Sequence, residues 1–385
     1  MKKEFCMMAI GLLLAGCSAD EEIANVQTSE ANAISFNVVG NNPQTKATII
    51  NSTNDLQHWP LGVFALKGGE PFMGTQAEDT EGYDDIGVKL IHQDGAWNYA
   101  NPADEHYWPH SEPLDFYAIA PYTSNNISWN QILSSQQIAV HTNDEINNPS
   151  TPNDDIMYAV ALGKTKEGTN GKVPLSFQHL FSQVSFQAKT SGERLYVAIE
   201  SMDLYNVMNA GTFSFPNHEN NNGSWAFYPD APKAKLNVIP AGSNITVNPG
   251  NVPTEISGNN TMLLIPQTLI PWNPVNDGPI IDEEDSGSNK TTLSYLRIKC
   301  KIWQNTSSEV HYLLGSDSAY DYSYVPFPAT WEAGKHYKYT LIFGGGYHKS
   351  GEEIDINPIR FNVSVSAWQE SQPDMDIDNP SAGGE

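Results

Sequence analysis

Cysteine is almost absent from this chain of 385 residues, which holds only Cys6, Cys17 and Cys300. Cys6 and Cys17 belong to the extreme N-terminus, so Cys300 stands alone in the remainder. A lone thiol cannot form an intramolecular disulfide, and a cysteine-based metal site is excluded with it. Stability must therefore come from a hydrophobic core, and the length is sufficient for two domains of ordinary size.

Basic residues are also scarce, because 20 Lys and Arg stand against 45 Asp and Glu, for a net charge of −25. Nucleic acids and anionic membrane surfaces would repel such a chain, so neither is expected as a partner. Clustered carboxylates at Asp154-Asp155 and at residues 282–285 offer the oxygen ligands that Ca²⁺ prefers. Solvated loops are the simpler interpretation of both clusters.

Catalytic motifs are missing as well. The chain contains no Gly-x-Ser-x-Gly elbow, no His-Glu-x-x-His pair and no phosphate-binding glycine loop between a strand and a helix. The ten histidines are scattered, and His179 lies between Phe177 and Phe181 in a strand-like run, which favours a structural role. The sequence therefore predicts a protein that is not an enzyme and binds no cofactor.

Long hydrophobic runs are absent too, and the apolar segment from Met7 to Leu14 is too short to span a bilayer. It follows Lys2 and Lys3, as in a signal peptide, which we assign to residues 1–16. Leu14-Ala15-Gly16-Cys17 resembles the lipobox of bacterial lipoproteins, in which the cysteine carries diacylglycerol and palmitate-type acyl chains. A plain secretory signal with a chance cysteine is the alternative.

The acidic segment from Ser18 to Glu22 resembles the export signal that places lipoproteins on the outer face of the cell outer membrane, although a solvated spacer would also be acidic. We interpret residues 17–32 as a linker after lipidated Cys17.

Turn-forming residues recur every 8 to 12 positions between short alternating apolar runs, and no amphipathic helix of 12 or more residues is evident. This pattern predicts an all-β fold of two packed antiparallel sandwiches, over residues 33–180 and 181–370, followed by a polar tail over residues 371–385. In the run from Leu293 to Ile302, Ile298, Cys300 and Ile302 share one face and Arg297, Lys299 and Lys301 the other, so Cys300 is predicted to be buried.

An ordered series of motifs resembles the fimbrillin-like family of Bacteroidetes-type surface lipoproteins, the subunits of type V fimbriae. The series covers most of residues 33–370 and comprises Trp97-x-Tyr99, Tyr107-Trp108-Pro109, Leu114 to Pro121, Asp155 to Ala159, Val173 to Leu180, Met262 to Gln267, Trp331 to Tyr339 and Val363-x-Val365-x-x-Trp368.

The resemblance implies two transthyretin-like β-sandwich domains in tandem and a role as a stalk, anchor or tip subunit of cell-surface fimbriae. It further implies that a protease removes the first strand and that the open groove accepts a strand from the next subunit. Thr45-Lys46-Ala47-Thr48 follows the expected first strand, which places the cut between Lys46 and Ala47. The family has Arg where this chain has Lys46, and a solvated loop is the alternative interpretation. The implied partners are other fimbrial subunits, the outer membrane through the lipid anchor, and ligands on host or bacterial surfaces.

The tail has Met375 and Ile377 as its only large apolar residues, so the strand from Phe361 to Val365 is the better donor. The alternative function is a non-polymerising surface lipoprotein that binds glycans through tryptophans such as Trp97, Trp108 and Trp331, although core packing is the favoured interpretation of the first two.

Overall fold

The computed structural model describes residues 32–40, 53–76, 85–143, 153–192, 194–219, 221–228, 233–250, 252–257, 262–280, 292–305, 309–344, 346–347, 353–354 and 360–367. This part of the chain is nearly all β, which confirms the predicted fold class. Its helices are short: α2 (Thr53–Leu56), α3 (Ile132–Ser135), α4 (Lys166–Thr169) and the 3₁₀ turn η1 (Pro102–Asp104). Among the described residues, no helix has the length and apolar character needed to cross a membrane.

The first sheet has eight strands in the order β1-β12-β11-β8-β2-β6-β7, with β3 beside β2. Its strands are β1 (Ser35–Gly40), β2 (Leu61–Lys67), β3 (Glu70–Met73), β6 (Val88–Gln93), β7 (Ala96–Tyr99), β8 (Leu114–Ala120), β11 (Met157–Lys164) and β12 (Lys172–His179). The pairing is antiparallel except between β1 and β12, which run parallel.

A second sheet covers one face of the first and has the order β16-β15-β10-β9. Its strands are β9 (Ile127–Gln131), β10 (Gln137–His141), β15 (Ala210–Ser214) and β16 (Ser224–Ala226). An apolar cluster that includes Phe64, Tyr158, Ile138 and Phe213 lies between the two sheets. The predicted boundary at residue 180 falls just after β12. The hairpin β15–β16 follows this boundary in the chain but joins the sheet of β9 and β10, which precede it.

Two further sheets enclose the largest core. One has the order β19-β13-β26-β29 with β20 beside β13, and the other has the order β17-β14-β22-β24-β27-β28 with β18 beside β14 and β23 beside β22. Their strands are β13 (Ser182–Thr190), β14 (Leu195–Val207), β17 (Ala234–Ile239), β18 (Ile245–Val247), β19 (Thr254–Glu255), β20 (Met262–Leu264), β22 (Tyr295–Asn305), β23 (Val310–Leu314), β24 (Asp321–Pro326), β26 (Lys335–Phe343), β27 (Gly346–Tyr347), β28 (Glu353–Ile354) and β29 (Arg360–Ala367). β13 and β26 also pair in parallel.

Two small pairs complete the described strands: β4 (Thr75–Gln76) with β5 (Asp85–Ile86), and β21 (Thr268–Leu269) with β25 (Ala329–Thr330).

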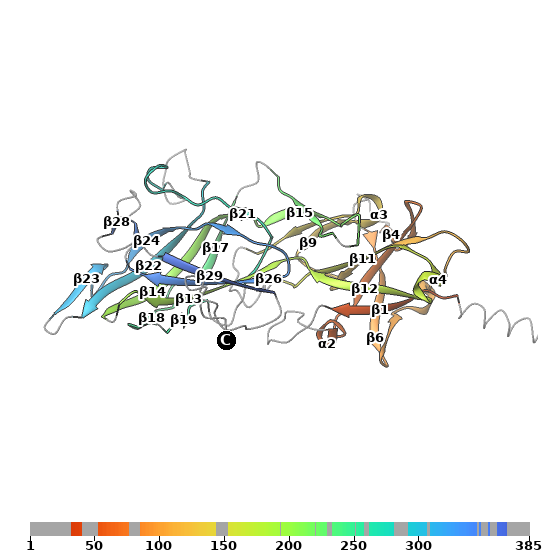
Figure 1. The fold of residues 1–385 in the computed structure, drawn as a ribbon, viewed down its shortest axis with the longest axis horizontal. Helices are drawn as coiled ribbons and strands as arrows, with labels where there is room; N and C mark the ends of the chain where they lie inside the picture. Colours follow the sequence, from red (N-terminus) through yellow and green to blue (C-terminus); the bar gives the residue numbers. More distant parts are fainter. Residues whose placement is uncertain are drawn as a thin grey trace, which may run out of the picture.

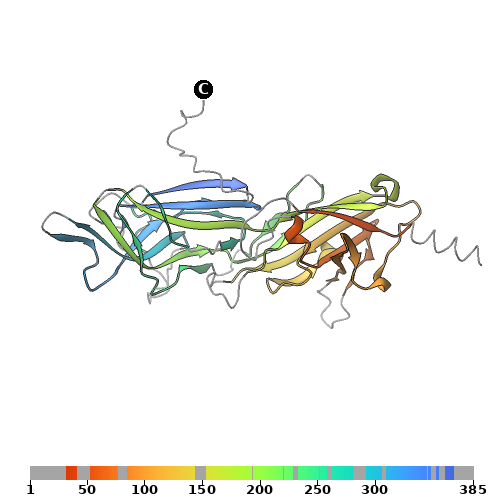
Figure 2. The same cartoon turned by 90° about the horizontal axis from the view of Figure 1, so that it is seen from below.

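The molecule is elongated, with the two pairs of sheets placed end to end along its long axis (Figures 1 and 2). β23 lies at one end, and α4 lies toward the other (Figure 1). The description of each half as transthyretin-like stays a prediction.

Period-2 alternation explains why these segments form half-buried strands. In β22 the inward residues Ile298, Cys300 and Ile302 are fully buried, while Lys299 and Lys301 point outward and stay partly exposed. The prediction that Cys300 is a buried core residue is confirmed, and its burial raises the pKa of the thiol. A thiol held in its protonated form in a core has no nucleophilic role.

Candidate functional site

The first strand, β1, is the end strand of its sheet, and its inward side chains cover the core beneath that sheet. β1 alternates, with Phe36 and Val38 buried and Asn37 and Val39 exposed. It pairs along six residues with β12, from Ser35 opposite Lys172 to Gly40 opposite Phe177. Parallel pairing is slightly less stable per residue than antiparallel pairing. β1 is thus a short edge strand whose attachment depends largely on its apolar side chains.

The start of β1 is fixed by contacts from β7 and from the loop segment that precedes β8. The Ile34 amide donates to the His106 carbonyl at 2.8 Å, and the Trp108 amide donates to the Asn32 carbonyl at 3.0 Å. From β7, the Tyr99 hydroxyl donates to the Ile34 carbonyl at 2.9 Å. Burial raises the pKa of Tyr99, so this hydroxyl stays protonated as a donor.

The side chains beneath β1 are aromatic and aliphatic. The Phe36 ring meets Tyr99 and Phe116 edge to face, with centroid distances of 6.1 Å in both cases. Trp108 contacts Phe116 in the same way at 5.8 Å. Val173, Leu175 and Phe177 of β12 are also buried in this cluster. We call the surface that β1 covers the β1 groove, defined by Tyr99, Trp108, Phe116, Val173, Leu175 and Phe177.

Chemically, the β1 groove suits an extended peptide. Without β1 it would present an unpaired strand edge on β12 beside a continuous apolar surface. Such an edge binds a strand through main-chain hydrogen bonds, and pockets for alternate side chains select its register.

The last strand is a second edge strand, and its core-facing side chains are less buried than those of β1. β29 pairs antiparallel with β26, from Ala367 opposite Lys335 to Arg360 opposite Ile342. Val365 lies opposite the buried Tyr337 and faces the core side, yet 49% of it is exposed. β29 also repeats a tripeptide of the first strand, since Phe361-Asn362-Val363 matches Phe36-Asn37-Val38. The two edge strands are therefore similar in sequence and unequal in burial.

The residues predicted for lipidation and processing, Cys17, Lys46 and Ala47, lie outside the described residues, and both assignments stay predictions. The same holds for the acidic run at residues 282–285 and for the polar tail over residues 371–385.

The tryptophans considered for glycan binding are mostly in cores. Trp108 is 4% exposed and Trp331 is 2% exposed, and the Trp331 indole donates to the Tyr339 hydroxyl at 3.0 Å. Trp97 is half-buried against the core that β1 covers. The packing interpretation is thus confirmed for Trp108, and neither Trp108 nor Trp331 has a ring face available for a sugar.

Asp154 and Asp155, the described carboxylates considered for Ca²⁺, have protein partners. His179 Nδ1 lies 3.1 Å from Asp155 Oδ1 with both side chains buried, which confirms the structural interpretation of His179. Asp154 accepts a hydrogen bond from Ser124 at 2.7 Å. Within the described ranges, no three His, Cys, Asp or Glu side chains gather as metal ligands do.

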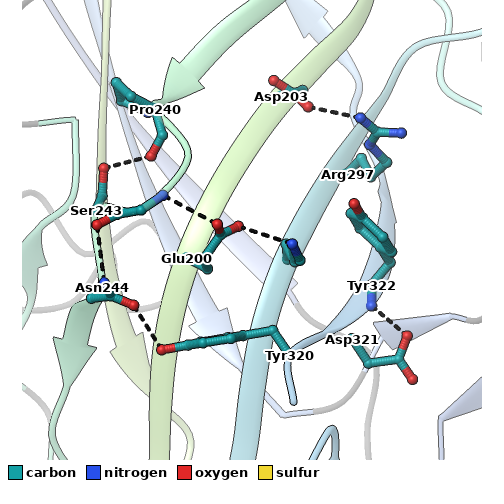
Figure 3. Close-up of polar contacts among 11 residues, drawn as sticks. Glu200, Asp203, Pro240, Ser243, Asn244, Arg297, Tyr320, Asp321 and Tyr322 are labelled. Carbon is teal, nitrogen blue, oxygen red and sulfur yellow. Dashed lines mark hydrogen bonds and ion pairs between the residues drawn. The ribbon is translucent and has the colours of Figure 1, made fainter. Parts of the chain in front are cut away.

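Sequence reasoning missed one surface on the outer face of β22. There the Arg297 guanidinium lies 5.1 Å from the ring centroids of Tyr205 and Tyr322. It is also paired with Asp203 at 3.1 Å (Figure 3). The tyrosines at 320, 322 and 324 could have predicted this surface, because alternate positions of a strand share one face.

Comparisons with known proteins agree with this architecture. A fimbrial protein from Bacteroides vulgatus ATCC 8482 superimposes with a TM-score of 0.56 at 16% sequence identity, covering 88% of this chain and 99% of that chain. At that identity the likeness shows the fold alone.

Two Porphyromonas gingivalis proteins are more distant. The tip fimbrial protein Mfa3 has a TM-score of 0.36 at 10% identity, covering 80% of this chain and 94% of that chain. The fimbrial anchor protein Mfa2 has a TM-score of 0.34 at 10% identity, covering 87% of this chain and 98% of that chain. No curated protein matches the chain in sequence. The sequence model described as Fimbrillin-like matches residues 45–368, and this chain therefore belongs to the fimbrillin-like family.

Proposed function

We propose that this protein is a structural or adhesive subunit of cell-surface fimbriae, and that subunits join when a strand from a neighbour takes the place of β1. The observation that carries the proposal is the position of β1: an edge strand, paired in parallel, whose alternate side chains fill an apolar groove. Such a strand can be exchanged for another of the same pattern without disturbing the sheets behind it.

The proposed first step is proteolysis between Lys46 and Ala47. A cut there would leave the segment containing β1 attached by noncovalent contacts alone. Six ladder residues and the side chains of Ile34, Phe36 and Val38 would then hold it. Each of these side chains contributes about 1.5–3 kcal/mol when buried, so an incoming strand must supply apolar groups of similar size.

The proposed donor is the β29 segment of the next subunit. With Phe361 in the place of Phe36, Val363 falls in the place of Val38, and Asn362 points outward as Asn37 does. The partial exposure of Val365 supports release of β29, because a strand with poorly covered side chains opens at a lower free-energy cost than a core strand.

The proposed tether is the acylated Cys17, which would hold the unassembled subunit at the outer face of the outer membrane. Several acyl chains on one residue give stable anchoring. Release from this tether would follow the cut at Lys46, since Cys17 lies in the segment that departs.

The experiment compares two chains. One is the mature chain, which begins at Cys17 after the assigned signal peptide, and the other begins at Ala47 and lacks β1. A synthetic peptide of residues 358–370 is added to each, and binding is measured by calorimetry together with the melting temperature. We expect the shortened chain to bind the peptide and to melt at a higher temperature with it, while the mature chain takes up none. A peptide with Phe361→Asp and Val363→Asp is the matched control and should not bind.

The proposal of strand exchange fails if the shortened chain folds, stays monomeric and binds neither peptide. Equal binding of the native and the charged peptide would also contradict it, because the β1 groove would then not be selecting apolar side chains.

A further inference from the structure

A strip of aromatic and basic side chains lies on the outer face of the sheet that contains β14, β22 and β24. We call it the sheet-face strip and define it by Tyr196, Lys299, Lys301, Trp303, Tyr320 and Tyr322. All six side chains are partly exposed. The deeper end of the same face is closed, since Tyr205, Tyr295 and Tyr324 are buried together with Trp272 and Ile280.

At its distal end, two rings of the strip form a row with a third ring, that of Tyr312 on the neighbouring strand β23. Tyr196, Trp303 and Tyr312 lie directly opposite one another on β14, β22 and β23. Trp303 stacks on Tyr196 with centroids 5.5 Å apart and planes 12° apart, and it contacts Tyr312 at 6.1 Å. Cross-strand aromatic contacts of this kind fix the rings in place while leaving their outer edges in solvent.

The middle of the strip alternates lysines with tyrosines. The Lys301 ammonium lies 4.6 Å from the centre of the Tyr320 ring, and the Lys299 ammonium lies 5.9 Å from that of Tyr322. The Tyr320 hydroxyl donates to Asn244 Oδ1 at 2.8 Å (Figure 3). These contacts hold long side chains in one arrangement, so a ligand would meet a surface that is already ordered.

The charges of the strip are balanced locally. Lys299 lies 3.6 Å from Glu200, which also accepts a hydrogen bond from the Gly242 amide at 3.1 Å. Lys301 donates to the Asp317 carbonyl at 2.5 Å. A polyanion would have to break these contacts and approach a chain of net charge −25, so a polyanionic ligand is disfavoured.

A dry protein interface is also a poor match, because none of the six side chains of the strip is aliphatic and two are charged. A sugar has both of the features that the strip can satisfy. Its C–H faces pack against aromatic rings, and its hydroxyl groups exchange hydrogen bonds with ammonium, carboxylate, amide and phenol groups.

We propose that the sheet-face strip binds a neutral oligosaccharide, which would make this subunit an adhesin for glycans. The proposal does not depend on strand exchange. β23 and the end of β22 lie at one end of the long axis, and α4 and the start of β1 lie at the other (Figure 1). A tether that precedes β1 would therefore direct the aromatic row away from the cell.

The test applies the mature chain to a printed array of neutral and acidic oligosaccharides, and then measures the dissociation constant of the best neutral glycan by calorimetry. Trp303→Ala removes the central ring of the row, and Lys301→Gln removes a charge while keeping a polar side chain. We expect at least a tenfold loss of affinity with Trp303→Ala and a smaller loss with Lys301→Gln. Trp97→Ala, in the first sheet rather than the sheet that carries the strip, is the matched control and should bind as the unchanged chain does.

Three results would overturn the proposal: no binding to any neutral glycan on the array, binding to acidic glycans alone, or an equal loss with Trp97→Ala and Trp303→Ala. The melting temperature of each variant and its uptake of the 358–370 peptide after removal of β1 are measured in parallel. If the Trp303→Ala chain does not fold, Lys301→Gln and Tyr320→Phe decide the matter, and unchanged affinity in both contradicts the proposal.

Discussion

Phe36 and Tyr99 meet edge to face, with ring centroids 6.1 Å apart and planes at 65°, although they lie on the two end strands of one sheet. The sheet therefore curls until β1 approaches β7, and the core that it encloses is closed by the Phe36 side chain. β1, the strand that seals this core, is joined to the sheet by its six-residue pairing with β12 alone. The contacts that close the core are thus the same contacts that must break when another strand replaces β1.

Replacing Phe36 by Ala should loosen β1 and lower stability. The buried ring contacts Tyr99 and Phe116, and its removal leaves a cavity, which costs about 3–5 kcal/mol for Phe→Ala in a core. Urea unfolding measures the loss, and amide hydrogen exchange should rise over β1 and β12. Asn37→Ala, on the exposed face of the same strand, is the control and should change stability by about 0.5 kcal/mol or less. Equal effects of the two substitutions would contradict the proposed role of Phe36.

The hairpin β15–β16 should make the two halves interdependent in folding. It pairs with β10, and Phe213 packs at 4.8 Å from the Tyr158 ring and at 5.4 Å from Trp225. A fragment of residues 33–180 lacks this hairpin and should expose the face of the first sheet that carries Tyr158. We expect it to bind hydrophobic dyes and to unfold without a cooperative transition. A cooperative, dye-negative fragment would show that the hairpin is dispensable.

Breaking the pair of Arg297 and Asp203 should be costly. Both side chains are largely buried, at 7% and 12% exposure, so Arg297→Ala leaves the Asp203 carboxylate without its cationic partner. The expected loss is about 3–5 kcal/mol by urea unfolding. Lys338→Ala breaks the exposed pair with Glu255 and serves as the control, with an expected loss of at most about 1 kcal/mol. A small loss in both variants would mean that water reaches Asp203.

Acidification should weaken the sheet around His336. Desolvation, helped by the nearby Lys338 charge, lowers the pKa of His336 from its usual 6.5 to about 4, and its ring is hydrogen-bonded to Ser185 at 2.8 Å. Since the folded chain favours the neutral ring, this stability is fully present above pH 6.5 and is lost as the pH falls from 6.5 through 4. The slope is at most about 1.4 kcal/mol per pH unit for one proton.

The measurement for His336 is the urea midpoint as a function of pH. His336→Gln should flatten the fall between pH 6.5 and 4, and His110→Gln, at an exposed position, should leave it unchanged. An unaltered slope in His336→Gln would assign the pH dependence to other groups.

Local alternation was enough to predict which face of a strand is buried. Ile298, Cys300 and Ile302 all point into the core, because successive residues of a strand must face opposite ways. The same rule does not say which sheet a strand joins. The hairpin around Phe213 follows β14 in the chain but pairs with β10. This pairing depends on packing between Phe213 and apolar residues distant in sequence, such as Ile138 and Tyr158.

Pairing direction and long-range ion pairs were equally hidden from the sequence. The strands were expected to be antiparallel, whereas β1 with β12 and β13 with β26 run parallel across long connections. Asp203 and Arg297 are 94 residues apart and meet only because β14 and β22 are in register. The position of β1 at a sheet edge agrees with the groove implied by the family resemblance, while the cut at Lys46 rests on sequence alone.

The most direct test of strand exchange is a disulfide between subunits on cells. If Phe361 takes the place of Phe36, Ser364 of one subunit lies opposite Ser176 on β12 of the next. We expect Ser176→Cys with Ser364→Cys to give a ladder of disulfide-linked surface oligomers that collapses on reduction, and neither single variant to give one. A double variant that reaches the cell surface, is cut after Lys46 and shows only monomer would contradict the account.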